Sequence, residues 1–162
     1  MWIPLDGVGR IFSVLLRFYR IIMNKTTAFV FAAGLGTRLY PLTADRPKAL
    51  VCYQNKPLLQ HVLEKIVAAG IDDIVVNVHH FPDQIIDFLK KHRFDARIRV
   101  SDERAYLRDT AGGLKFAEPL LGDADTLLLY NVDIISNIDI NKMLKSHSES
   151  PYTSKSVKQA RS

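Results

Sequence analysis

The feature that most constrains the fold is a continuous apolar run, Ala28 to Ala33, inside a predicted strand over residues 26–33. An unbroken apolar strand, rather than one with alternating polar residues, is typical of a parallel sheet covered on both faces. The run leads directly into Gly34-Leu35-Gly36. Glycine permits positive φ and lets the backbone approach a ligand without a Cβ in the way. We therefore expect a buried strand whose carboxyl end opens into a tight turn.

Strand and helix patterns alternate through the rest of the chain. In chain order the sequence predicts a helix from Pro57, a strand over residues 73–78, a helix from Pro82, a strand over 97–101, a helix from about Ala111 to Leu120, a strand over 126–130 and a helix from near Asp139. This β-α-β-α-β-α-β order predicts an α/β fold, Rossmann-like and doubly wound, with a mainly parallel sheet. Ligands in such sheets bind beyond the carboxyl ends of the strands.

The loop after the first strand carries two cations, Arg38 and Lys48. Consecutive N–H groups in a glycine turn can converge on an anion. The planar guanidinium of Arg38 matches phosphate oxygens, and Lys48 acts as a point charge. Pro41 and Pro47 stiffen the intervening segment. The glycine pair alone is as typical of an ordinary βα turn, but together with the two cations it favours a polyphosphate site.

Two common phosphate loops do not fit this sequence. A P-loop closes with Gly-Lys-Ser/Thr, whereas Gly36 is followed by Thr37-Arg38. A dinucleotide-binding turn requires a third glycine where this chain has Leu39.

With these motifs in place, the chain resembles the nucleotidyltransferases that make NDP-sugars from sugar 1-phosphates. Their pattern is close to L-A-A-G-x-G-T-R-x-x-P-L-T-x-x-x-P-K-x-L, and this chain carries its counterpart between Phe31 and Leu50. The resemblance continues to about Ser148. It is greatest to the branch with mannose-1-phosphate guanylyltransferases and N-acetylmuramate-1-phosphate uridylyltransferases. It implies the nucleotide-diphospho-sugar transferase fold, an NTP (GTP or UTP) and a sugar 1-phosphate as substrates, and Mg²⁺ as cofactor.

The resemblance also implies roles for individual residues. Arg38, Lys48 and Asp133 are the expected catalytic residues, with Asp133 as the metal ligand. The expected nucleotide-binding residues are Ala32, Ala33, Gly34, Gly36, Thr37, Arg38, Lys48, Gly112 and Asn131.

Asn131-Val132-Asp133 directly follows the predicted strand 126–130. A carboxylate at the end of a buried strand requires a partner, and Mg²⁺ takes one or two carboxylates together with substrate phosphates. From the residues alone, an Asp that caps the next turn is the favoured interpretation. The resemblance reverses that preference. The usual residue before this Asp in the family is Gly, and here it is Val132.

Asp109-Thr110-Ala111-Gly112-Gly113 has two interpretations. Asp109 or Thr110 can cap the helix that follows. The resemblance implies that the glycines approach the nucleobase, and the two roles are compatible.

The net charge of +5 does not indicate a nucleic-acid partner. The excess lies in residues 1–22 and 151–162, while residues 23–150 carry equal numbers of basic and acidic side chains.

A single cysteine, Cys52, excludes an internal disulfide and is compatible with the cytoplasm. Residues 1–22 lack an apolar stretch long enough to span a membrane. An amphipathic helix on a membrane surface is the alternative, and an upstream extension without membrane contact is the preferred interpretation.

The expected organisation has three parts. Residues 1–22 form an N-terminal extension, 23–148 the nucleotide-binding part of a nucleotidyltransferase domain, and 149–162 a disordered or unrelated tail. The polar segment 146–156 is expected to be disordered.

Family members continue well beyond Ser148, so we expect a C-terminally truncated chain. Self-association through an open sheet edge is then expected. The alternative function is a catalytically incomplete nucleotide-binding fragment without turnover of its own.

Overall fold

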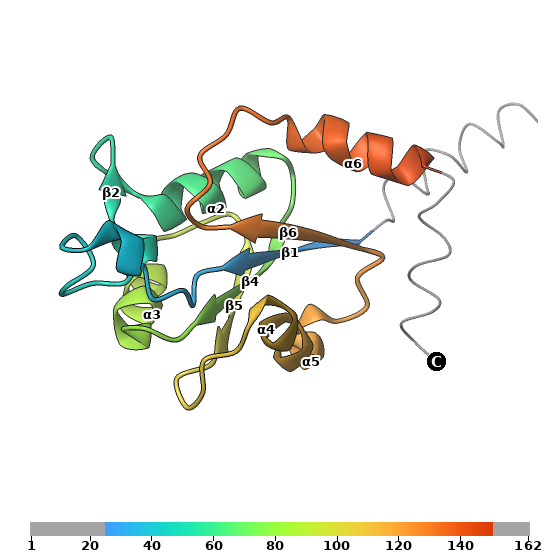
Figure 1. The fold of residues 1–162 in the computed structure, drawn as a ribbon. Helices are drawn as coiled ribbons and strands as arrows, with labels where there is room; N and C mark the ends of the chain where they lie inside the picture. The colour runs from blue at the N-terminus through green and yellow to red at the C-terminus, as the bar shows by residue number, and fades with distance from the viewer. Residues whose placement is uncertain (1–24, 151–162) are drawn as a thin grey trace, which may run out of the picture.

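A parallel sheet of four strands organises the part of the chain that the structure, a computed structural model, describes: residues 25–150. The strand order is β5-β4-β1-β6 (Figure 1). The strands are β1 (Thr26–Phe31), β4 (Asp73–Val78), β5 (Arg97–Asp102) and β6 (Thr126–Asn131). All neighbouring pairs in this sheet are parallel. The predicted α/β, doubly wound architecture is confirmed.

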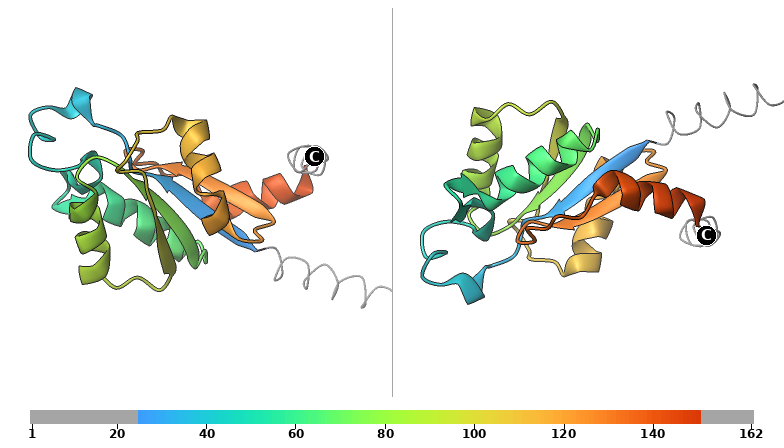
Figure 2. Two further views of the ribbon diagram at one scale, coloured as in Figure 1. Left: turned by 90° about the horizontal axis from the view of Figure 1, so that it is seen from below. Right: turned by 90° about the horizontal axis from the view of Figure 1, so that it is seen from above.

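Helices cover both faces of the sheet. They are α2 (Leu58–Ala68), α3 (Pro82–Lys91), α4 (Thr110–Phe116), α5 (Glu118–Leu121) and α6 (Ile140–Glu149). Helices α2, α3 and α6 lie on one face of the sheet, and α4 and α5 lie on the other (Figures 1 and 2). Side chains of the first three pack into one apolar cluster, and α4 and α5 contribute to a second. The helix predicted from Ala111 to Leu120 is two short helices, because Pro119 has no backbone N–H and is tolerated only in the first turn of a helix.

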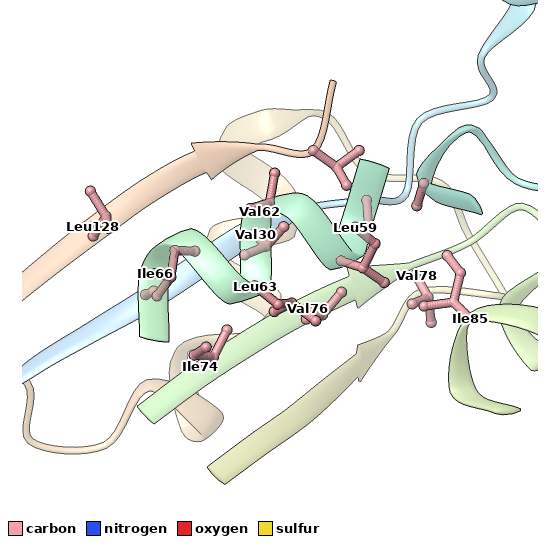
Figure 3. Close-up of a cluster of buried hydrophobic side chains, with 14 of the residues drawn as sticks. Val30, Leu59, Val62, Leu63, Ile66, Ile74, Val76, Val78, Ile85 and Leu128 are labelled. Carbon is pink, nitrogen blue, oxygen red and sulfur yellow. The ribbon is translucent and has the colours of Figure 1, made fainter. Parts of the chain in front are cut away.

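The larger core lies between α2 and the sheet (Figure 3). Successive side chains of a strand point to opposite faces. Val30 and Val76 therefore face α2, while Phe29 and Val75 belong to the cluster beneath α4 and α5. Leu63 of α2 is fully buried in the larger core, and truncating such a leucine to alanine costs about 2–5 kcal/mol.

Gly70 ends α2 in a left-handed conformation. Gly70 has φ +82, its N–H donates to the Val67 carbonyl, and the Ile71 N–H donates to the Ile66 carbonyl. These two bonds form a Schellman motif, which satisfies carbonyls that the helix itself leaves unpaired.

The start of α2 differs from the prediction. Pro57 is not the first helical residue; it lies in β3 (Lys56–Pro57), which pairs with β2 (Cys52–Tyr53) in a short antiparallel hairpin. Gln54 and Asn55 form the turn, both with positive φ. Two such central residues give the hairpin turn whose twist matches that of the strands.

The expected disorder of residues 146–149 is wrong, because α6 continues to Glu149. Asp139 caps this helix by accepting a hydrogen bond from the Lys142 N–H at 3.0 Å, and Ile140 and Leu144 pack into the larger core. The cap and the apolar face outweigh the polar composition of the last turn. The predicted extension 1–22 and the segment 151–162 lie outside the described residues.

None of the helices between residues 25 and 150 combines the length and apolar character needed to cross a lipid bilayer.

Candidate nucleotide site

The predicted site lies at the carboxyl edge of the sheet, between β1 and β6. Phe31 at the end of β1 is in register with Asn131 at the end of β6. The chain proceeds from β1 to β4 and β5 on one side, and then crosses to β6 on the other side of β1. Doubly wound sheets bind ligands where the strand order reverses in this way. The segment between β1 and α2 projects beyond this edge (Figures 1 and 2).

Gly36 allows the loop after β1 to turn back on itself. Its φ is +68, and a Cβ built on it would lie 2.9 Å from both Lys48 Cβ and Thr43 Cγ2. A side chain is therefore excluded both by backbone conformation and by space. The buried Thr43 closes the turn by donating from its hydroxyl to the Gly36 carbonyl at 3.0 Å.

Five consecutive backbone N–H groups in this loop have no acceptor. Within residues 25–150, nothing accepts a hydrogen bond from the N–H groups of residues 34–38. Apart from the half-buried Gly36, these residues are exposed. A run of free amides around a residue in the left-handed conformation is a concavity that suits an anion.

The two backbone N–H groups before this run already have a hydrogen-bond acceptor. Ala32 and Ala33 are buried, and their N–H groups donate to Asn77 Oδ1 at 2.7 and 3.2 Å. Hydrogen bonds from the loop backbone to a ligand must therefore start at Gly34.

Lys48 and Asp133 meet across the switch point. Lys48 Nζ lies 2.8 Å from Asp133 Oδ2, and 17% and 37% of the two side chains are exposed. Lys48 opens a short 3-10 helix, η2 (Lys48–Leu50), whose second residue, Ala49, is fully buried in the larger core. This anchor holds the lysine at the sheet edge. Its side chain also passes Gly34, since a Cβ there would lie 3.8 Å from Nζ.

The lysine keeps Asp133 ionised. The hydrogen bond from Lys48 lowers the pKa of the Asp133 carboxyl below its ordinary value; partial burial opposes this, and the charges of Lys48 and Arg38 lower the pKa further. Asp133 is thus a carboxylate at neutral pH, which is the form that a metal ion requires.

The residues present fit one magnesium ion that is shared with phosphates. Within residues 25–150, no three His, Cys, Asp or Glu side chains are grouped to hold a metal by themselves. Mg²⁺ does not need such a cage, because it is usually bound through one or two carboxylates plus substrate phosphates. Asp133 would supply the carboxylate.

Val132 replaces the family's glycine without disturbing the strand end. Its N–H donates to the Phe31 carbonyl at 3.2 Å, and its side chain is fully buried in the larger core. Val132 is also not among the described residues with positive φ, so the position does not require glycine. The next turn closes with a bond from the Ile134 N–H to the Asn131 carbonyl.

Helix α4 packs against Glu103 and Asn77, and Asn77 binds the amides of Ala32 and Ala33 just before the loop. Asp109, one of the two caps that the sequence offered, caps this helix by accepting from the Gly112 N–H at 2.6 Å. The two glycines lie inside the helix rather than before it. A Cβ on Gly113 would lie 2.9 Å from Glu103 Oε1 and 3.2 Å from Asn77 Nδ2, so a side chain here would displace one or both of these groups.

The predicted site residues do not all meet. Lys48 and Asp133 are in contact, and the backbone at Gly34 and Gly36 packs against the lysine side chain. Arg38 acts on Asp133 through its charge. The structure records no contact of Thr37, Asn131 or Gly112 with these residues; Thr37 and Asn131 are exposed and Gly112 is half-buried.

Sequence reasoning did not find Asn77, Glu103 or Thr43. All three are buried polar residues that hold the loop or its surroundings. The signal for Asn77 was available: it is the only polar side chain within the apolar stretch Ile74–Val78, and a polar group in such a strand must have a partner.

The fold and the site together define an α/β protein with a loop of unpaired backbone amides beside the Lys48–Asp133 pair at its switch point. The profile of the family described as "Nucleotidyl transferase" matches residues 27–159, and the chain belongs to this family. The match extends beyond Ser148, where the sequence resemblance was expected to end.

The curated relatives act on sugar 1-phosphates. An N-acetylmuramate α-1-phosphate uridylyltransferase of Caulobacter vibrioides is 46% identical over 111 residues, which is 67% of this chain and 46% of the relative. A mannose-1-phosphate guanyltransferase of Aspergillus fumigatus is 40% identical over 123 residues, 74% of this chain and 34% of the relative. The chain therefore spans less than half of the length of either protein.

Solved structures agree with this assignment. HddC from Yersinia pseudotuberculosis complexed with GMP-PN superposes with a TM-score of 0.68 at 27% identity, covering 76% of this chain and 55% of that chain. A CTP:phosphocholine cytidylyltransferase from Streptococcus pneumoniae gives a TM-score of 0.57 at 31% identity, covering 73% and 50% of the two chains.

Proposed function

We propose that this chain binds an NTP with Mg²⁺ and takes part in nucleotidyl transfer to a sugar 1-phosphate. A phosphate oxygen of the sugar 1-phosphate attacks the α-phosphorus of the NTP. The bond between the α-phosphorus and the bridging oxygen breaks, and that oxygen leaves with pyrophosphate. The NDP-sugar keeps the new phosphoanhydride bond. Such a step needs no covalent intermediate on the protein, since positioning and charge neutralisation supply the catalysis.

The observation that carries this proposal is the run of unpaired loop amides, residues 34–38, beside the Lys48–Asp133 pair. The free N–H groups suit phosphate oxygens, and Arg38 offers a planar fork for the same oxygens. Lys48 neutralises charge at the reacting phosphates. Asp133 would hold a Mg²⁺ ion, which would supply further neutralisation of the triphosphate.

The remaining predicted contacts belong to the same proposal. We infer that Thr37 in the loop, Asn131 at the end of β6 and Gly112 in α4 also contact the nucleotide. Ala32 and Ala33 contribute through their packing and carbonyls, because Asn77 occupies their N–H groups. GTP and UTP are the first candidates, since the curated relatives are named as guanyl- and uridylyltransferases.

A pyrophosphate-release assay tests the proposal. The chain is incubated with Mg²⁺, each of GTP, UTP, CTP, ATP and dTTP, and a panel of sugar 1-phosphates that includes mannose 1-phosphate and N-acetylmuramate 1-phosphate. Calorimetric titration of each NTP runs in parallel. Release that depends on both substrates supports transfer, and the absence of NTP binding with every nucleotide overturns the proposal.

The second candidate is a nucleotide-binding chain without turnover of its own. The observation that favours it is the short span of the match, 46% and 34% of the lengths of the two relatives. NTP binding without pyrophosphate release from any pair would select this candidate.

We propose a cytoplasmic location for either activity, because the lone Cys52 is an exposed free thiol.

The open edge of β6 suits a second copy of this chain. In the described sheet β6 lies at one edge and β5 at the other. The β5 edge carries Arg97, Arg99 and Asp102, whereas Thr126–Asn131 contains no charged residue. Leu127 and Leu129 of β6 are 38% and 48% exposed. Charges normally protect an edge from pairing, and an uncharged strand can pair with its own copy about a two-fold axis.

A further inference from the structure

A chain of buried hydrogen bonds connects the start of the loop to Glu103, the residue that follows β5. Asn77 Oδ1 accepts from the N–H groups of Ala32 and Ala33, at 2.7 and 3.2 Å. Asn77 Nδ2 donates to Glu103 Oε1 at 2.9 Å. Asn77 and Glu103 are 4% and 2% exposed. These bonds link β1, β4 and the residue that follows β5.

Glu103 is itself held at several points. Its N–H donates to the Val78 carbonyl at 2.8 Å, and its carbonyl lies 2.8 Å from His79 Nδ1. The carboxylate packs against Gly113 of α4, where a Cβ would come within 2.9 Å of Oε1. Its second oxygen, Oε2, is buried without a hydrogen-bond partner in the described part of the chain. A buried carboxylate oxygen left unpaired costs free energy, so packing alone does not explain why a glutamate stands here.

The position of Asn77 explains what the network does. Asn77 lies directly beside Phe31 in the β1–β4 register, and its oxygen accepts from the next two amides along the chain. Two hydrogen bonds to one oxygen orient both peptide planes just before the loop. The five amides that follow, residues 34–38, then have no acceptor within residues 25–150.

We propose that Asn77 is the positioning residue of the anion-binding loop, and that Glu103 acts through it by orienting the Asn77 carboxamide. Neither side chain touches the nucleotide in this role. Asn77 sets the direction in which the amides from Gly34 onward point. The proposal rests on the proposed function only for the identity of the anion, an NTP triphosphate.

Asn77 and Glu103 form an amide–carboxylate pair. Exchanging the two functional groups between these positions tests positioning of the loop separately from packing. Asn77→Asp keeps an oxygen for Ala32 and Ala33 but places a carboxylate against Glu103. Aspartate lacks the amide nitrogen that donates to Glu103 Oε1, so the side chain at position 77 loses the hydrogen bond that fixes its orientation. Adding Glu103→Gln to Asn77→Asp restores one donor and one acceptor, but the side chain at position 103 now donates to the one at position 77. The parent pair and the pair in the double variant have nearly the same shape.

NTP affinity, measured by calorimetry, is the first readout. Asn77→Asp is expected to weaken binding by about 10-fold or more, and the double variant is expected to recover to within about threefold of the parent. Glu103→Gln alone keeps an oxygen that can accept from Asn77 and is expected to lose less affinity than Asn77→Asp. The inference is overturned if Asn77→Asp binds as tightly as the parent, or if the double variant recovers no affinity.

Amide hydrogen exchange at Ala32 and Ala33 is the second readout, and it needs no nucleotide. Protection is expected to fall in Asn77→Asp and to return in the double variant. Unchanged protection in Asn77→Asp contradicts the inference. If the parent binds no NTP while the exchange pattern follows the swap, the proposed function fails and the positioning of the loop stands.

Thr27→Val is the matched control for a purely structural loss. Thr27 is fully buried in β1, the strand that leads into the loop, but it lies near the end of β1 that is far from the loop. Its hydroxyl donates to Asp73 Oδ2 at 3.2 Å. It is expected to lower the unfolding midpoint while leaving NTP affinity and the exchange of Ala32 and Ala33 unchanged. An equal loss of NTP affinity in Thr27→Val would show that stability, and not positioning, explains the effect of Asn77→Asp.

Discussion

Lys48 and Asp133 are 85 positions apart in the chain, yet Lys48 Nζ lies 2.8 Å from Asp133 Oδ2. The contact exists because β1 and β6 are parallel neighbours whose carboxyl ends coincide. The lysine arrives from the loop after β1 and the aspartate from the turn after β6. This pair couples the two halves of the candidate site electrostatically, and four of the predictions below concern it or the loop beside it.

Lys48→Met is expected to weaken NTP binding about 10- to 100-fold, since a hydrogen bond to a charged group contributes about 1.5–3 kcal/mol. The neutral side chain keeps most of the volume but loses the charge that faces the phosphates. Calorimetric titration with the NTP measures the loss. Lys90→Met, on the exposed end of α3, is the matched control and should bind as the parent does. Equal affinities for Lys48→Met and Lys90→Met would contradict the assignment of Lys48.

Asp133→Asn is expected to remove the contribution of Mg²⁺ to NTP binding. Without metal the variant should bind the NTP at least as tightly as the parent, because a negative charge near the phosphates is gone. Titrations with Mg²⁺ and with a chelator measure the difference. Asp87→Asn, an exposed carboxylate on α3, should keep the full Mg²⁺ effect. A Mg²⁺ effect of parental size in Asp133→Asn would exclude Asp133 as the ligand.

The pKa of Asp133 should respond to Lys48. The hydrogen bond from Lys48 lowers this pKa below the ordinary value of 3.8. Titration of the side-chain carboxyl by ¹³C NMR should give a lower midpoint in the parent than in Lys48→Met. The same coupling sets a pH dependence of stability. A lowered pKa in the folded state stabilises the protein at pH values above 3.8, and this contribution is lost as the pH falls through the lowered value.

That sign can be checked with urea unfolding. The parent should be more stable than Lys48→Met from neutral pH down to about pH 5, and the difference should shrink in more acidic solution as Asp133 becomes protonated. A difference that grows on acidification would contradict the ion pair.

Gly36→Ala is expected to destabilise the loop for two reasons. The left-handed conformation costs an alanine about 1–2 kcal/mol, and its Cβ would lie 2.9 Å from Lys48 Cβ. NTP binding should weaken as Lys48 is displaced. Gly70→Ala is the matched control, because Gly70 has φ +82 but no atom within 4 Å of an added Cβ. Unfolding midpoints should fall for both variants, and NTP affinity only for Gly36→Ala.

Leu129→Lys is expected to abolish self-association at the β6 edge. The charge would lie in the exposed apolar surface of an edge strand, where it opposes strand pairing. Size-exclusion chromatography with light scattering across a concentration series measures the change. Leu42→Lys, at an exposed leucine outside the sheet, should associate as the parent does. A parent that stays monomeric at every concentration would contradict the second copy as the partner of this edge.

The sequence predicted the sheet well, because its strands are strongly patterned. The run around Val30 is apolar, and the stretch around Val76 is apolar except for Asn77; such runs are typical of buried parallel strands. The hairpin at Gln54–Asn55 was missed for the opposite reason. Its strands have two residues each, and the turn lacks the Asn-Gly or Asp-Gly pair that marks such hairpins in a sequence. The last turn of α6 was missed because its composition is polar and its stability comes from a cap and from packing.

The site was predicted in part. Local spacing was enough to identify Gly36 and Lys48, since both lie on the same loop. The sequence left Asp133 with two roles, turn cap or magnesium ligand, and it did not indicate that Lys48 Nζ would lie 2.8 Å from Asp133 Oδ2. For Ala32 and Ala33 the neighbouring residues contain no sign that their amides are occupied. The acceptor, Asn77, is far along the chain and comes into contact through the β1–β4 pairing.

The sequence by itself determined the alternating α/β order, the glycine-arginine-lysine loop and the family to which the chain belongs. These follow from hydrophobic periodicity and from residue types at fixed local spacing, which the chain carries without being folded. Only the tertiary structure decided which groups face one another: Lys48 with Asp133, Asn77 with Ala32 and Ala33, and Glu103 with Gly113. Strand pairing brings distant residues within hydrogen-bond reach, and that proximity determines which amides remain free for a ligand.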